Sequence, residues 1–374
     1  MSERARGEEA SRSVDERPGG MAGGKVARSA SHESAVQEDS AVAGDALVEV
    51  EGLSRRFDVS SAWLNRVVRR EPRRILTAVD DVSLSVTRGE TYALVGESGS
   101  GKSTIAKMIV GLLSPSEGRV RIGGTDPERA SGEAMTALRR RVQMIFQDPY
   151  ASLNPRWRVL DIVGEPMRVF ALASGRDAVE KRVAALLEQV GLSAADATRF
   201  PHEFSGGQRQ RIGIARALAS EPELIVCDEP TSALDVSVQA QVLNLMRDLQ
   251  SELGLTYLFI THDLSVVRYM ADTIGVLYLG RLVESAPRET LFNEPAHPYT
   301  RMLLDAAPRL DGFGRKHASD GVEVPDPIRP PPGCHYHPRC PYRVDGCDER
   351  YPPRRAIGAR TVRCFEAERV LGRS

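Results

Sequence analysis

A glycine-rich segment, GESGSGKST, is the feature of this 374-residue sequence that most constrains its fold. It follows a short apolar strand pattern, TYALV, and precedes an apolar helical pattern, IAKMIVGLL. Glycines let consecutive backbone N–H groups and the N-terminus of the helix face an anion. The spacing G-x-x-x-x-G-K-[ST] predicts that Lys102 bridges terminal phosphates and that the Ser103 hydroxyl binds Mg²⁺. The predicted phosphate site comprises Gly96, Glu97, Ser98, Gly99, Ser100, Gly101, Lys102, Ser103 and Thr104.

Short apolar strands alternate with helical patterns after Thr91, which predicts an α/β core with a largely parallel sheet. Alternation also predicts a strand before this core, at 47–53. The later predicted strands are 142–146, 223–227, 256–260 and 273–279. Helical patterns at 159–170, 178–190 and 208–219 predict a helical subdomain, about residues 150–220, set into the core.

Two carboxylates, Asp228 and Glu229, follow the predicted strand ELIVC. In an open α/β sheet, the carboxyl ends of the strands are where ligands bind, so this pair is expected beside the phosphate loop. We expect Asp228 to hold Mg²⁺, directly or through water. We expect Glu229 to orient and polarise the attacking water as a general base.

Four further segments identify a family resemblance. They are FQDP with Gln147, FSGGQRQR with Ser205, Gly206, Gly207 and Gln208, SALD with Asp235, and ITHD with His262. Together with the phosphate loop they resemble the ATP-binding cassette (ABC) ATPases. The resemblance implies a P-loop NTPase fold, an ABC nucleotide-binding domain of the α/β class, with ATP and Mg²⁺ as cofactors.

The resemblance also implies roles for these residues. Gln147 would contact Mg²⁺, water and the membrane partner, and His262 would stabilise the γ-phosphate, so that both join Glu229 as catalytic residues. The SGGQ segment would grip the ATP of an opposite protomer, and Asp235 would belong to the nucleotide site. Phe57 matches the aromatic residue that stacks on adenine; the alternative is a core aromatic at a strand end.

Several segments are more specifically similar to the ATPase subunits of bacterial oligopeptide and dipeptide importers, among them MIFQDPYASLNPR and HPYTRMLL. A basic insertion before AVDDVSL, with Arg66, Arg69, Arg70, Arg73 and Arg74, resembles the second of the paired subunits. The resemblance implies a peripheral protein on the cytoplasmic face of the membrane. Its partners would be a second ABC ATPase subunit, two permeases and an extracytoplasmic peptide-binding protein. We expect the two cassettes to form a heterodimer, with an identical second cassette as the alternative. The alternatives are an importer of nickel or another small solute, and a soluble ABC ATPase that acts on DNA or ribosomes.

Composition and patterning divide the chain into three parts. Residues 1–45 lack apolar periodicity and are expected to be a disordered tail. Residues 46–293 are expected to form the ATPase domain, and 294–374 a small separate extension.

The charge balance excludes a strongly basic protein. The 50 Lys and Arg nearly balance the 51 Asp and Glu, so we expect no nucleic-acid partner. No secretory signal or membrane-spanning apolar stretch is predicted.

Four cysteines lie in the predicted extension with the spacing C-x5-C-x6-C-x16-C: Cys334, Cys340, Cys347 and Cys364. Clustered thiolates favour iron–sulfur clusters or zinc. The spacing lacks the C-x2-C pairs of zinc ribbons, and resemblance to the peptide-importer ATPases implies a [4Fe–4S] cluster. Zinc and free thiols remain the alternatives, with His335 and His337 as possible substitute ligands. Cys227 is expected to be a small buried hydrophobe.

Overall fold

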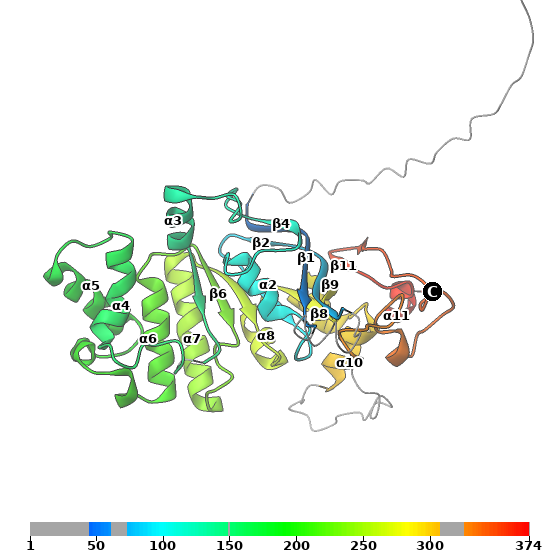
Figure 1. Cartoon of the computed structure of the whole chain (residues 1–374). Helices are drawn as coiled ribbons and strands as arrows, with labels where there is room; N and C mark the ends of the chain where they lie inside the picture. The colour runs from blue at the N-terminus through cyan, green and yellow to red at the C-terminus, as the bar shows by residue number, and fades with distance from the viewer. Residues whose placement is uncertain (1–44, 61–72, 149, 307–324, 374) are drawn as a thin grey trace, which may run out of the picture. The chain divides into compact units, whose positions relative to one another are not determined.

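The computed structural model describes residues 45–60, 73–148, 150–306 and 325–373, which all belong to one compact unit, Val42–Ser374 (Figure 1). Residues 1–44 of the predicted tail lie outside the described residues. So do Arg66, Arg69 and Arg70 of the basic insertion. Within the described ranges, no helix combines the length and the apolar character needed to cross a membrane.

Eight strands form the main sheet. In spatial order they are β10 (Arg355–Ile357), β11 (Arg360–Val362), β9 (Arg281–Pro287), β8 (Thr273–Tyr278), β3 (Thr91–Val95), β7 (Thr256–Ile260), β6 (Leu224–Asp228) and β5 (Val142–Ile145). The strands from β8 to β5 are parallel, and β9, β11 and β10 continue the sheet antiparallel. The predicted α/β class with a largely parallel sheet is confirmed.

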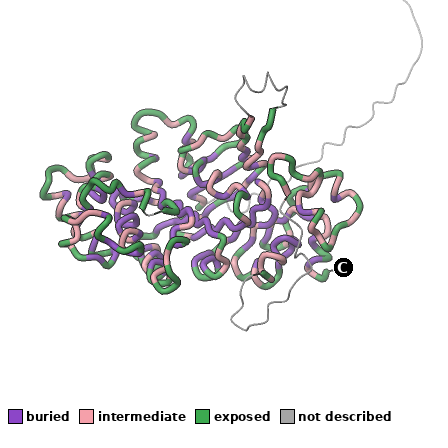
Figure 2. Tube along the Cα trace, turned by 60° about the horizontal axis from the view of Figure 1, so that its bottom comes forward, coloured by how far each residue is buried: buried purple, intermediate pink, exposed green. Residues whose placement is uncertain are grey.

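Helices cover both faces of the parallel strands. Side chains alternate along a strand, so β6 contributes to two buried clusters. Val226 is buried with Ile105, and Ile225 is buried with Met246. Figure 2 shows the resulting band of buried residues through the middle of the molecule. The helices of the core are α2 (Lys102–Ile109), α3 (Gly132–Arg141), α7 (Val236–Leu253) and α8 (Leu264–Met270).

A second sheet of three antiparallel strands packs against α2. Its order is β2 (Ile75–Thr87), β1 (Ala46–Asp58) and β4 (Glu117–Ile122). Strand β1 extends beyond the predicted 47–53 because it stays paired with β2 as far as Asp58, through several register shifts. Val50 and Leu53 of β1 are buried with Ile105 of α2, so this sheet completes the core on the α2 side.

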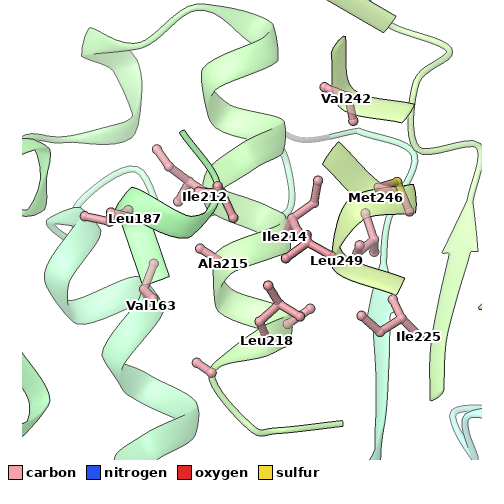
Figure 3. Packing of buried hydrophobic residues seen from close by; sticks show 14 of the residues in the cluster. Val163, Leu187, Ile212, Ile214, Ala215, Leu218, Ile225, Val242, Met246 and Leu249 are labelled. Carbon is pink, nitrogen blue, oxygen red and sulfur yellow. The ribbon is translucent and has the colours of Figure 1, made fainter. Parts of the chain in front are cut away.

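The helical insert occurs where the sequence predicts helices. It contains α4 (Val159–Val169), α5 (Arg176–Gln189) and α6 (Gly206–Leu218), with short 3-10 turns η1 (Ala194–Thr198) and η2 (Pro201–Glu203). Figure 3 shows that α6 is buried on two sides, with Ile212 and Ala215 near Val163 of α4 and Leu187 of α5. The insert therefore shares its apolar core with the main sheet.

The C-terminal extension is joined to the ATPase core. Strand β11 pairs with β9 of the main sheet. Tyr299 and Tyr336 share a buried cluster with Tyr278 of β8. The expected separate extension is therefore not found in the described residues, because its aromatic side chains pack on the core sheet. Its helices and turn are α10 (Pro298–Ala306), η3 (His337–Arg339) and α11 (Ala367–Val370), and the helix α9 (Arg288–Asn293) comes just before it.

Candidate functional site

The predicted phosphate loop connects β3 to α2. All three of its glycines have positive φ angles: 152° at Gly96, 78° at Gly99 and 105° at Gly101. A Cβ atom at Gly96 would overlap the carbonyl oxygen of Leu277, and one at Gly101 would overlap that of Ala78. The loop can therefore keep this path only with glycine at both positions.

Lys102 lies folded back over this loop. Its Nζ atom donates to the carbonyl oxygens of Gly96 at 2.8 Å and Glu97 at 2.9 Å, and more weakly to Ser100 Oγ at 3.4 Å. The side chain is buried, which lowers the pKa of the ammonium group. The loop's carbonyl groups thus hold a desolvated cation at the N-terminus of α2.

Ser103 and Asp228 come together at the carboxyl edge of the sheet. Ser103 Oγ donates a 2.9 Å hydrogen bond to Asp228 Oδ1. Burial is the largest cause of the raised pKa of Asp228, and neighbouring Glu229 adds to it. A hydroxyl and a carboxylate oxygen in contact are oxygen donors of the kind that Mg²⁺ prefers, so the pair fits that ion.

Glu229 lies between two other predicted site residues. Gln147 Nε2 donates to Glu229 Oε2 at 2.9 Å, and His262 Nδ1 lies 3.0 Å from Glu229 Oε1. The Glu229 backbone has a φ of 48°, in the left-handed region, and its N–H donates to the carbonyl of Ile260. The structure thus brings the three predicted catalytic residues together on one carboxylate.

The SGGQ segment forms the N-terminus of a different helix. Ser205 caps α6: its hydroxyl accepts from the Gln208 backbone N–H at 3.3 Å, and the Gln208 side chain accepts from the Ser205 N–H at 3.0 Å. In Figure 1, α6 lies apart from α2, with α7 and β6 between them. The described residues show no hydrogen bond or ion pair between Ser205–Gln208 and the phosphate loop.

Asp235 and Phe57 occupy local structural positions in this chain. The Asp235 carboxylate caps α7, accepting from the Val238 N–H at 3.0 Å and the Ser237 hydroxyl at 2.7 Å, and these bonds lower its pKa. Phe57 is half-buried at the end of β1, with the Arg55 guanidinium 4.7 Å from its ring centre. Within the described residues, neither side chain makes a hydrogen bond, an ion pair or a cation–π contact with the phosphate loop.

The four cysteines of the extension line one small cavity, shared with His297 and His337. None forms a disulfide. Burial raises the pKa of the Cys340 thiol to about 11 and that of Cys364 to about 12. Among the described residues, no group of three or more potential ligands is placed to hold a metal ion. His335 instead packs its ring against Tyr351.

Two residues that sequence reasoning did not assign also contact the phosphate loop. Tyr299 Oη accepts from the Glu97 backbone N–H at 3.0 Å, and Arg339 Nη1 lies 3.2 Å from Glu97 Oε1. Tyr299 falls inside the HPYTRMLL segment. That segment contributes to the resemblance to peptide-importer ATPases, but the resemblance assigns no contact to this tyrosine. Arg339 lies between two cysteines, and nothing in its local sequence points to the loop.

Comparisons with known proteins identify two regions. Residues 79–232 match the family model described as ABC transporter, and residues 283–347 match the model described as oligopeptide/dipeptide transporter, C-terminal region. Among solved structures, the chain resembles a dimeric post-hydrolysis state of the ATP-binding cassette MJ0796 bound to ADP and Pi. The TM-score is 0.56 and the identity 29%, over 64% of this chain and 98% of that one.

Curated relatives match most of the described chain. The oligopeptide transport ATP-binding protein AppF of Bacillus subtilis is 46% identical, over 82% of this chain and 93% of its own length. The dipeptide transport ATP-binding protein DppF of Escherichia coli is 45% identical, over 79% and 89%. The di/tripeptide transport ATP-binding protein DppF of Pseudomonas aeruginosa is 44% identical, over 86% and 97%. The chain therefore belongs to the ABC transporter family, among the ATPases that carry the oligopeptide/dipeptide transporter C-terminal region.

Proposed function

We propose that this chain is the ATP-binding and ATP-hydrolysing subunit of an importer of oligopeptides or dipeptides. ATP hydrolysis is supported above all by one observation: Gln147 and His262 contact the two carboxylate oxygens of Glu229. The transport assignment is supported by the matched C-terminal region and by relatives named for oligopeptide and dipeptide transport.

The proposed mechanism assigns one task to each side chain. Lys102 and the N-terminus of α2 bind the terminal phosphates of ATP. Ser103 and Asp228 would hold Mg²⁺, which would supply positive charge to offset that of the phosphates. Glu229 accepts a proton from the attacking water, with Gln147 orienting that carboxylate. His262 stabilises charge on the γ-phosphate.

Hydrolysis is proposed to need a second cassette. The segment Ser205–Gln208 presents the N-terminus of α6, a second anion-binding helix end remote from Lys102. It would contact the ATP held by the phosphate loop of a facing, non-identical cassette, with Asp235 beside that contact. Phe57, whose ring already lies beside the Arg55 guanidinium, would stack on adenine.

The remaining assignments concern assembly and boundaries. We place the chain at the cytoplasmic face of the membrane, with two permeases and an extracytoplasmic peptide-binding protein as partners, as the second of two paired ATPase subunits. Residues 46–293 are assigned to the ATPase domain, with its helical subdomain at about 150–220, and residues 294–374 to the extension.

The four cysteines are proposed to hold a [4Fe–4S] cluster. Four thiols that line one cavity and form no disulfide are the donor set of a thiolate-bound centre. The resemblance to the peptide-importer ATPases favours the cluster, and a single zinc ion or free thiols are the alternatives.

Peptide uptake by cells that carry Lys102→Ala tests the transport assignment. We expect uptake of labelled di- and oligopeptides to be lost, because the phosphates lose their cation. Lys181→Ala, at an exposed position on α5, is the matched control and should transport normally. Normal peptide uptake with lost nickel uptake would replace this assignment by the nickel alternative. If neither uptake changes, the importer assignment is wrong.

A further inference from the structure

One peptide unit of the phosphate loop is held at both of its ends. The carbonyl oxygen of Gly96 accepts from Lys102 Nζ at 2.8 Å. The N–H of the same peptide, on Glu97, donates to Tyr299 Oη at 3.0 Å. The orientation of this peptide therefore depends on a tyrosine of the C-terminal extension.

The side chain of Glu97 makes a second link to the extension. Arg339 Nη1 lies 3.2 Å from Glu97 Oε1 and 3.4 Å from Oε2. The Arg339 side chain is only 8% exposed, and that of Glu97 is 26% exposed. A pair shielded in this way is screened less by salt than a surface ion pair. Arg339 thus adds a charged contact beside the hydrogen bond of Tyr299.

Tyr299 is itself held rigidly. It is fully buried, with its ring centre 4.5 Å from that of Tyr278 and 5.4 Å from that of Tyr336. Its backbone N–H donates to His297 Nδ1 at 3.0 Å. A side chain locked by packing on both sides keeps its hydroxyl at a defined place, so the hydroxyl can position the loop.

Arg339 is fixed by the cysteine-lined part of the extension. It ends the turn η3, which starts at His337, and the chain reaches Cys340 at the next residue. The Cys334 carbonyl accepts from the His337 N–H at 2.9 Å, and the Cys340 N–H donates to the His337 carbonyl. The arginine that contacts Glu97 is therefore carried by a turn that is hydrogen-bonded to Cys334 on one side and to Cys340 on the other, and both cysteines line the same cavity.

From these contacts we infer that Tyr299 and Arg339 are positioning residues for ATP binding. Tyr299 holds the Gly96–Glu97 peptide and Arg339 holds the Glu97 side chain, which keeps the carbonyl groups that bind Lys102 in the orientation in which the loop receives phosphate. The inference rests on the proposed function in one respect, that the phosphate loop is the ATP site. It applies whichever solute is transported, because none of these contacts involves the transported solute.

Tyr299→Phe removes the acceptor and keeps the ring packing. A hydrogen bond contributes about 0.5–1.5 kcal/mol, so we expect the Kd of the full chain for a fluorescent ATP analogue to rise about 3- to 10-fold. The KM for ATP should rise in parallel, with kcat within about twofold. Tyr257→Phe is the matched control, because it loses a buried 3.1 Å bond to the Met246 carbonyl, away from the loop. Its Kd should not change.

Arg339→Lys tests the second contact independently. We expect a higher Kd for the analogue, and no change for Arg343→Lys, which alters an exposed pair with Asp348 in the same extension. In a Glu97→Gln background the effect of Arg339→Lys should shrink, because its partner has lost the charge.

Two results would overturn the inference. One is an unchanged Kd in Tyr299→Phe together with the same loss of thermal stability as in Tyr257→Phe, which indicates a structural role alone. The other is an Arg339→Lys effect that persists undiminished in Glu97→Gln. A wild-type chain that binds no ATP analogue would instead refute the proposed function, so the two failures are distinguishable.

Discussion

Ser103 donates a 2.9 Å hydrogen bond to Asp228, although 125 residues separate them in the chain. The contact follows from the sheet order, in which β3 and β6 both flank β7 and so end at the same edge. If this pair holds Mg²⁺, Asp228→Asn should raise the Mg²⁺ concentration needed for half-maximal ATPase activity by about tenfold or more. A titration of Mg²⁺ at a fixed ATP concentration measures this requirement. Asp272→Asn, at the residue just before β8, is the control. An unchanged Mg²⁺ requirement would exclude Asp228 as a ligand.

Glu229→Gln should retain ATP binding and lose turnover. A positioned general base contributes roughly 10² to 10⁴-fold, so kcat in the assembled complex should fall by about 10² or more. The variant should accumulate as a nucleotide-bound dimer, visible by size-exclusion chromatography with ATP. Glu188→Gln, at an exposed position on α5, should behave as wild type. Turnover within about threefold of wild type would remove Glu229 from the general-base role.

Gln147→Ala should separate ATP binding from activation by the transporter. Gln147 is exposed, follows β5 and begins the connection to the helical insert, so it is placed to relay contacts between Glu229 and a docked permease. We expect weak ATPase activity from the isolated chain and strong stimulation by permeases, partner cassette and loaded binding protein. The substitution should reduce this stimulation more than it reduces ATP affinity. Full activity of the isolated chain, stimulated by DNA or ribosomes, would favour the soluble alternative.

Gly101→Ala should destabilise the folded protein. The new Cβ would overlap the Ala78 carbonyl oxygen, and alanine at a φ of 105° adds backbone strain, so a cost of about 1–3 kcal/mol or more is expected. Gly213→Ala is the opposite case, because it lies inside α6 with open space around its Cβ. It should stabilise by about 0.5–1 kcal/mol. Urea unfolding of both variants measures the difference, and equal stabilities would contradict the loop geometry.

Removal of two cysteines should affect both metal content and nucleotide binding. Protein purified without oxygen is expected to be brown, with about four irons per chain. Cys340→Ser combined with Cys347→Ser should abolish the iron and also weaken ATP binding, because Arg339 is carried by the adjoining turn. Cys227→Ala, in the core strand β6, should keep the iron. One zinc ion per chain would favour the zinc alternative. If the protein contains neither iron nor zinc, the free-thiol alternative remains.

The grouping of Ser103 with Asp228, and of Glu229 with His262, could be predicted from the sequence because each of these residues belongs to a local motif. The phosphate loop, the Asp228–Glu229 pair and His262 each follow a strand, and the parallel sheet brings those strand ends together. The contacts of Glu97 are different, because its partners lie 202 and 242 residues away and belong to a Pro- and Cys-rich segment without periodicity. Only the packing of that segment on β8 and β9 reveals them.

The distance in sequence between Glu97 and Arg339 also orders events during synthesis. A ribosome adds about 5–20 residues per second, so the 242 residues between them take on the order of tens of seconds to make. Until Tyr299 is made, 202 residues after Glu97, the nascent chain has its phosphate loop but neither side chain proposed to orient it, and until Arg339 is made it lacks the second. Incomplete chains should therefore compete poorly for cellular ATP, and full affinity should appear only after Arg339 has left the ribosomal tunnel.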